Sequence, residues 1–244
     1  ESIRESAVAY NKTITPGAAE EAYSQASIRA ASEDYVNQLN VSGSGIMGYV
    51  EIPKIGVDLP IYHGTGADSL DRGTGHLLGS SLPVGGESTH TIITGHSGMA
   101  SQKMFTDLEQ LREGDIFYLH VLDETLAYEV REIHTVLPHD TTYLGIEPGE
   151  DLCTLVTCTP TGVNTHRLLV HGSRIPYVPT EETEASAVLH EENTDSNWEK
   201  QYWLGVRLGL AAMVFLTLVA GAVLYIRRNR GRAVHRKGGR YVRK

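Results

Sequence analysis

The stretch TLVTCTPTGVNTHRLLVHGSR, residues 154–174, decides how the rest of the chain is interpreted. Its first four residues are β-branched or apolar and lead into Cys158, after which Pro160 and Gly162 break the run. A second apolar run begins at Arg167. The pattern predicts two adjacent antiparallel strands that bring the Cys158 thiol and the Arg167 guanidinium within side-chain reach.

This juxtaposition of a thiol and a guanidinium has two interpretations. A cation beside a thiol stabilises the thiolate, which is the form that acts as a nucleophile. A buried structural cysteine beside a surface arginine would have the same spacing. The residues of this stretch do not choose between the two interpretations.

The composition is that of an ordinary globular protein, with 41% apolar and 21% charged residues. The charge, however, is divided unevenly. Residues 1–203 hold all 30 acidic residues and 11 of the 21 basic ones, a formal charge of −19, whereas residues 204–244 hold ten basic residues and no acidic one. An acidic body with a basic tail argues against nucleic acid as a partner of the body.

The two cysteines, Cys153 and Cys158, are five residues apart in one predicted strand. A regular strand would hold them roughly 16 Å apart and point them to opposite faces, so a disulfide between them is not expected. The chain contains neither a CxxC pair nor an HExxH segment, and its 11 histidines show no metal-ligand spacing.

The amino-terminal part divides into two segments. Residues 1–45 are predicted to form an N-terminal helical segment, with a helix over 17–39. Residues 46–176 hold many short strands, a short helix over 101–112, and a hairpin over 115–137, which favours a closed or nearly closed β-barrel. The chain starts at Glu1 without an apolar signal segment, so we expect a processed or trimmed end there.

The carboxy-terminal part indicates a membrane anchor. Residues 177–203 read as an acidic linker, and residues 204–226 as a transmembrane helix with 19 consecutive uncharged residues, about 28 Å of helix. Residues 227–244 form a tail with nine Lys or Arg. By the positive-inside rule this tail is cytoplasmic, so we expect a single-pass C-terminal anchor in the cell membrane and an extracellular acidic body.

Two histidines are candidates for the partner of Cys158. His96 follows a predicted strand in the loop TIITGHSG, a common way to project a catalytic side chain, and it is favoured. His166, next to Arg167, is the alternative. Arg167 would stabilise the thiolate or the oxyanion of an attacked carbonyl, both of which suit acyl transfer through a thioester. A salt bridge to the acidic surface is its structural alternative.

Residues 154–174 resemble the signature of sortases, the cysteine transpeptidases of Gram-positive cell surfaces. In that family a TLxTC strand is followed by an arginine and preceded by a TGH loop, here Cys158, Arg167 and His96. The longer form TCTPxGxNTxRLLVxGxR is similar to class C, the pilin-polymerising sortases. Four further segments are similar to that class: GYVEIPKI (48–55), LPIYHG (59–64), GSSLPVGG (79–86) and FTDLEQLREGDIFYLHVL (105–122).

The resemblance implies a mostly β fold, a closed eight-stranded sortase-type barrel with short helices. Cys158 would attack the Thr–Gly bond of an LPxTG-like sorting signal, and an amine, in class C a lysine of the next pilin subunit, would resolve the acyl-enzyme. His96 would protonate the leaving amine, and Arg167 would hold the substrate carbonyl. The expected partners are pilin subunits or other surface proteins with such signals, and no metal or organic cofactor is expected.

The N-terminal segment departs from the class C pattern. Class C sortases usually carry a lid with an Asp-Pro-aromatic motif that plugs the active site. Residues 1–45 contain one proline, Pro16, and no such motif. We therefore expect no acidic-aromatic plug against Cys158: the site is either open or covered by another residue of this segment, with Tyr23 and Tyr35 as candidates.

Three other functions compete with pilin polymerisation. A wall-anchored sortase substrate would need an LPxTG-like pentapeptide before the apolar run, and residues 175–182, IPYVPTEE, lack the Thr-Gly pair. A cysteine peptidase would resolve the same thioester with water. A class C relative that attaches pili or surface proteins to the cell wall would use the amine of a wall precursor.

Overall fold

The computed structural model describes residues 2–24, 32–41, 43–99 and 102–179, together with residues 208, 213 and 221. The chain divides into two compact units, Glu1–Val178 and Pro179–Lys244. Nearly all of the predicted linker (177–203), transmembrane helix (204–226) and tail (227–244) lie outside the described residues. Within the described ranges, no helix is both long and apolar enough to span a bilayer.

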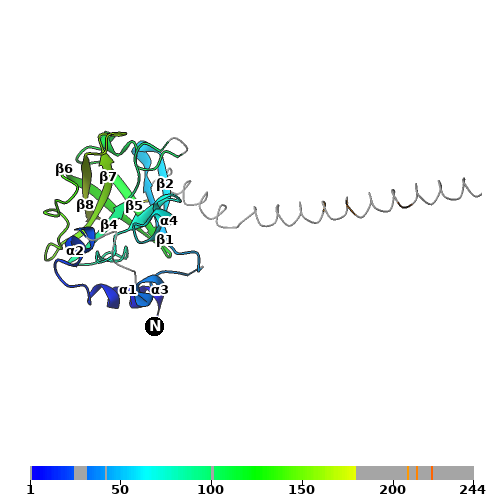
Figure 1. The fold of residues 1–244 in the computed structure, drawn as a ribbon. Helices are drawn as coiled ribbons and strands as arrows, with labels where there is room; N and C mark the ends of the chain where they lie inside the picture. Colours follow the sequence, from blue (N-terminus) through cyan, green and yellow to red (C-terminus); the bar gives the residue numbers. More distant parts are fainter. Residues whose placement is uncertain are drawn as a thin grey trace, which may run out of the picture. The chain divides into compact units, whose positions relative to one another are not determined.

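The first unit is built on a closed barrel of eight strands in the order β1-β2-β3-β4-β7-β8-β6-β5 (Figure 1). The β2–β3 and β4–β7 pairs are parallel and the other six are antiparallel. The predicted barrel and hairpin are thus confirmed. The strands are β1 (Ile46–Ile52), β2 (Val57–His63), β3 (Thr74–His76), β4 (Thr89–Thr94), β5 (Ile116–Val121), β6 (Glu124–Val136), β7 (Asp151–Thr159) and β8 (His166–Ile175).

The central strands are buried on both faces, which explains their nearly continuous apolar runs. Leu155 of β7 belongs to a first cluster that includes Ile93 and Val170. Val156, the next residue, points to the opposite face and belongs to a second cluster. This second cluster is made of Ala19, Leu77, Ile92, Val136, Leu144, Val156 and Leu169, with Tyr23 packed against it.

Among its described residues, the N-terminal segment has three short helices, α1 (Ile3–Asn11), α2 (Ala18–Ser24) and α3 (Glu33–Asn37), so the single helix predicted over 17–39 is wrong. Ser32 has the extended backbone of an N-cap, with φ −70° and ψ 154°, and its hydroxyl accepts a hydrogen bond from the Tyr35 amide at 3.2 Å. Because a capping serine begins a new helix, the pattern that looked continuous is interrupted there. Figure 1 shows α2 beside β4 and β8, in agreement with the packing of Ala19.

The helix predicted over 101–112 is also wrong. The structure has only a 3-10 turn, η2 (Leu108–Gln110), and Met104 has a φ of +42°, which a right-handed helix excludes. The apolar residues of this stretch are nevertheless buried beneath the loop: Met104, Phe105, Leu108 and Leu111. The described residues of the unit also include η1 (Pro53–Ile55) and α4 (Ala67–Leu70).

Candidate active site

Cys158 and Arg167 are direct partners in the antiparallel β7–β8 ladder. Side chains at such paired positions share a face, and their Cβ atoms lie about 5 Å apart. Both residues are half-buried, at the end of the barrel where the two strands meet the loop that joins them. The prediction that adjacent antiparallel strands place Cys158 beside Arg167 is confirmed. The Arg167 guanidinium donates to the carbonyls of Asn164 and His166, at 3.3 Å and 3.1 Å.

The other thiol is unsuited to chemistry. Cys153 is fully buried in the first cluster, and burial raises the pKa of its thiol well above the usual value. Both cysteines are free, and they lie on opposite faces of β7, as the strand period predicts. Within the described part of the chain, no group of three or more His, Cys, Asp or Glu side chains could hold a metal ion.

His96 lies at the same level of the barrel as Cys158. β4 runs parallel to β7 with Thr94 opposite Val156, and the chain after β4 continues alongside β7. The Gly95 amide donates to the Val156 carbonyl at 3.0 Å, and the Ser97 hydroxyl donates to the Cys158 carbonyl at 2.7 Å. The imidazole between these two contacts is 38% exposed, so it is accessible to a substrate.

A buried aromatic ring fixes the conformation of this loop. A Cβ atom at Gly95 would lie only 2.7 Å from Cδ2 of Phe105, so only glycine fits beneath that ring. The Phe105 amide also donates to the His96 carbonyl at 2.9 Å. The loop that presents His96 is therefore held by packing from a segment that follows it in the chain.

The alternative partner, His166, points elsewhere. It pairs with Thr159, one position away from the Cys158–Arg167 pair, and successive strand residues point to opposite faces. Its Nδ1 lies 3.0 Å from the hydroxyl of Thr165. The geometry thus favours His96 as the partner of Cys158.

Sequence reasoning missed a carboxylate beside His96. Asp71, at the end of α4, places Oδ1 3.7 Å from His96 Nε2 and is 65% exposed. Its neighbour Arg72 lies over the Tyr62 ring, 4.3 Å from the centroid. The charged turn at 68–72 was visible in the sequence, but nothing there linked it to a histidine more than twenty residues away.

A tyrosine from α2 lies near the candidate nucleophile. Burial raises the pKa of Tyr23, the charge of Arg167 opposes that rise, and the charge of Cys158 adds to it, so Tyr23 is close to both groups. Its hydroxyl is buried and lies toward the Arg167 guanidinium. The sequence left two outcomes, an open site or a site covered by Tyr23 or Tyr35, and the position of Tyr23 favours the second.

The second tyrosine considered from the sequence has a structural role. Tyr35 is fully buried, and its hydroxyl contacts His76 Nδ1 at 2.9 Å and accepts from the Gly64 amide at 2.9 Å. Of the two candidates, only Tyr23 lies beside Cys158.

A series of hydrogen-bonded side chains lies further along the face of β7 that carries Cys158. His90 Nδ1 lies 2.7 Å from the Gly145 carbonyl, which can only accept, so this nitrogen donates. His90 Nε2 then accepts from the Thr154 hydroxyl at 2.6 Å, and Thr154 accepts from His171 Nδ1 at 2.7 Å. Both histidines are neutral in this arrangement, since burial lowers the pKa of His90 and lowers that of His171 to about 3.

Through Gly145, these hydrogen bonds reach the loop before β7, which lies beside α2. The loop is pinned at Gly145, where a Cβ atom would lie 3.0 Å from Glu20 Oε1 of α2. The loop and α2 are thus neighbours above the second cluster, with Cys158 at one end of that face. Neither His90 nor His171 was singled out from the sequence, because their contacts join segments far apart in the chain.

Known proteins share both the sequence pattern and the fold. The family model for the sortase domain matches residues 50–175. The curated sortase A of Streptococcus agalactiae is 30% identical over 130 residues, which cover 52% of this chain and 52% of that protein, so this chain spans about half the length of that relative.

Two solved structures are similar over a larger share. The sortase C-1 of Actinomyces oris is 44% identical with a TM-score of 0.66, over 72% of this chain and 98% of that one. The sortase C of Streptococcus pneumoniae, whose structure bears on catalysis and pilin substrate specificity, is 46% identical with a TM-score of 0.63, over 73% of this chain and 89% of that one.

Proposed function

Because this chain belongs to the sortase family and its structural neighbours place it in class C, we propose that it is a cysteine transpeptidase that assembles pilins. The observation that carries the proposal is the direct pairing of Cys158 with Arg167, with His96 at the same level on the neighbouring strand. A thiol, a fixed cation and an imidazole are what acyl transfer through a thioester requires.

The first half-reaction would form the thioester. The Cys158 thiolate attacks the threonine carbonyl of an LPxTG-like signal, and Arg167 donates to the oxyanion that develops. His96 gives a proton to the glycine nitrogen as the C–N bond breaks, so that a neutral amine leaves. The acyl group remains on the sulfur.

The second half-reaction would transfer the acyl group to an amine. His96, now neutral, takes a proton from the incoming amine as the nitrogen attacks the thioester, and the Cys158 thiolate leaves. The amine we propose is a lysine of the next pilin subunit, as the resemblance to class C implies, and the pilin substrates of the pneumococcal neighbour support this choice. A wall-precursor amine or water would complete the same step in the two competing functions.

We propose the membrane as the location of this reaction. Residues 204–226 would be the anchor, the tail 227–244 with its nine basic residues would be cytoplasmic, and the acidic catalytic unit would be extracellular. Pilin subunits carrying sorting signals would then be within reach on the outer surface.

The decisive experiment offers the protein an LPxTG peptide together with a lysine-containing pilin domain. A product in which the threonine carbonyl is linked to the lysine side chain supports the proposal. Coupling only to a wall-precursor amine would favour the wall-attachment function. Cleavage without any coupled product would favour the hydrolytic peptidase.

A further inference from the structure

Two anchors hold the N-terminal segment on the barrel, and α2 lies between them in the sequence. Asn11, at the end of α1, exchanges two hydrogen bonds with the backbone of Leu82, at 2.7 Å and 3.2 Å. On the other side, α3 inserts the fully buried Tyr35, whose hydroxyl accepts from the Gly64 amide. The two anchors thus flank α2, which also packs on the second cluster through Ala19 and Tyr23.

His63, at the end of β2, contributes to the second anchor. Its Nδ1 lies 3.0 Å from the carbonyl oxygen of Gly45, the residue before β1. Its Nε2 lies 2.7 Å from the carbonyl oxygen of Gln38, the C-cap of α3. The ring thus joins both ends of the loop between α3 and β1.

These two contacts together define the charge of the ring. A carbonyl oxygen accepts hydrogen bonds and cannot donate them, so each ring nitrogen of His63 needs a hydrogen. A neutral imidazole carries one such hydrogen and would direct a lone pair at the other carbonyl. Only the imidazolium form satisfies both Gln38 and Gly45.

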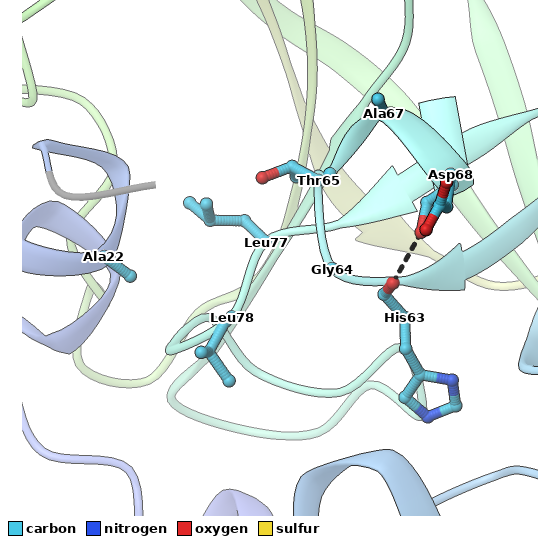
Figure 2. A pocket seen from close by; sticks show the side chains of 10 residues that line it. Ala22, His63, Gly64, Thr65, Ala67, Asp68, Leu77 and Leu78 are labelled. Carbon is cyan, nitrogen blue, oxygen red and sulfur yellow. Dashed lines mark hydrogen bonds between the residues drawn. The ribbon is translucent and has the colours of Figure 1, made fainter. Parts of the chain in front are cut away.

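The surroundings of His63 are compatible with a positive charge. The ring packs edge-on against Tyr35, with 5.2 Å between centroids, and the nearby His76 of β3 is neutral because burial lowers its pKa to about 4. Asp68 of α4 lines the same 340 Å³ cavity as His63 (Figure 2), and Asp34 of α3 accepts from Gln38 at 3.4 Å. Figure 2 shows the His63 ring pointing away from Asp68, Thr65 and Leu77.

We propose that His63, in its protonated form, holds the N-terminal segment over Cys158. When the ring loses a proton, one of its two bonds is lost, α3 is held less firmly, and α2 leaves the thiol more often. Access to Cys158 would therefore increase when a rise in pH removes this proton. The inference rests on the proposed function only in naming Cys158 as the nucleophile.

The first test measures alkylation of Cys158 by iodoacetamide, an uncharged reagent, in the full chain and in the variant His63→Gln. Glutamine can donate to one carbonyl only and does not titrate. The rate ratio of variant to wild type, read on the peptide that contains Cys158, cancels the pH dependence of the thiol itself. We expect a ratio up to about tenfold near pH 5.5 that falls toward one near pH 8.5.

The matched control is His139→Gln, at an exposed histidine in the loop before β7. Its ratio should stay at one across the same range. A ratio for His63→Gln that is equal at the two pH values, or below one in acid, would overturn the proposal. Alkylation does not require a sorting signal, so this result is independent of whether the chain transfers acyl groups.

A second test uses the wild-type chain and needs no variant. Hydrogen exchange of the Val36 and Gln38 amides, which donate to Ser32 and Tyr35 in α3, reports how firmly the second anchor is held. After correction for intrinsic exchange, their protection should fall between about pH 5.5 and 8.5, while that of the β7 amides changes little. Unchanged protection in α3 would contradict this role of His63.

Discussion

Each face of β7 carries one cysteine, and the two thiols differ in burial and in their neighbours. Cys153 and Leu155 point into the first cluster, where burial raises the pKa of the Cys153 thiol. Val156 and Cys158 point to the other face, where Cys158 is only half-buried and lies opposite Arg167. The neighbours of each thiol, rather than the residue type, therefore decide which one can react.

The largest expected difference between the two faces is the loss of the nucleophile. Cys158→Ala should reduce acyl transfer by at least about 10³-fold, because no thioester can form. Cys153→Ala is the matched control and should keep its turnover, with some loss of stability from the buried cavity. Mass spectrometry after incubation with an LPxTG peptide measures both, and an acyl adduct on the Cys158→Ala variant would contradict the assignment.

The two candidate histidines give the next largest contrast. His96→Ala should lower the transfer rate by about 10²–10⁴-fold, since it removes the proton donor to the leaving amine. His166→Ala should have little effect, because His166 pairs with Thr159 on the opposite face. Initial rates with peptide and amine acceptor measure both variants, and the reverse result would overturn the choice of partner.

A smaller effect, on the pH dependence of stability, is expected from the hydrogen bonds that join His90, Thr154 and His171. His171 has a pKa of about 3 when folded and near 6.5 when unfolded, so the unfolded chain binds more protons between these values. The His171 contribution to stability is complete above pH 6.5 and is lost as the pH falls, by about 1.4 kcal/mol per pH unit.

The variant His171→Asn isolates this contribution. Its side-chain amide can still donate to Thr154 but does not titrate. Urea unfolding between about pH 4 and 7 should show a shallower loss of stability in the variant than in the wild type. Equal pH slopes would mean that His171 is not neutral and buried in the folded protein.

The smallest expected effect is on the access of reagents to Cys158, which Tyr23 limits. Tyr23→Ala should increase the alkylation rate of Cys158 by several-fold, because it removes the ring that lies near the thiol. Tyr10→Ala, at a half-buried tyrosine of α1, is the control and should change this rate much less. An unchanged rate for Tyr23→Ala would show that this ring does not limit access.

Local patterns predicted much of the barrel correctly. The β5–β6 hairpin and the β7–β8 pair follow from apolar runs separated by turn residues, and such runs have few other ways to pair. The two helix predictions failed for local reasons. Ser32 caps a new helix, and Met104 adopts a left-handed conformation so that Phe105 can reach Gly95.

The candidate site was predicted in part. Its thiol, guanidinium and imidazole lie where the motif indicated, but Asp71 and the chain from His90 to His171 were missed. These contacts join side chains from loops and strands that no periodicity connects. A pattern within one segment cannot report which distant segment packs against it.

The sequence by itself determined which thiol lies opposite the arginine, because strand residues alternate between faces and neighbouring strands pair in register. Only the tertiary structure decided that His96, rather than His166, stands level with Cys158, and that Tyr23 covers the thiol. The physical reason is that both contacts are non-local: parallel pairing of β4 with β7 carries the histidine loop to the site, and the packing of α2 on the second cluster brings the tyrosine there.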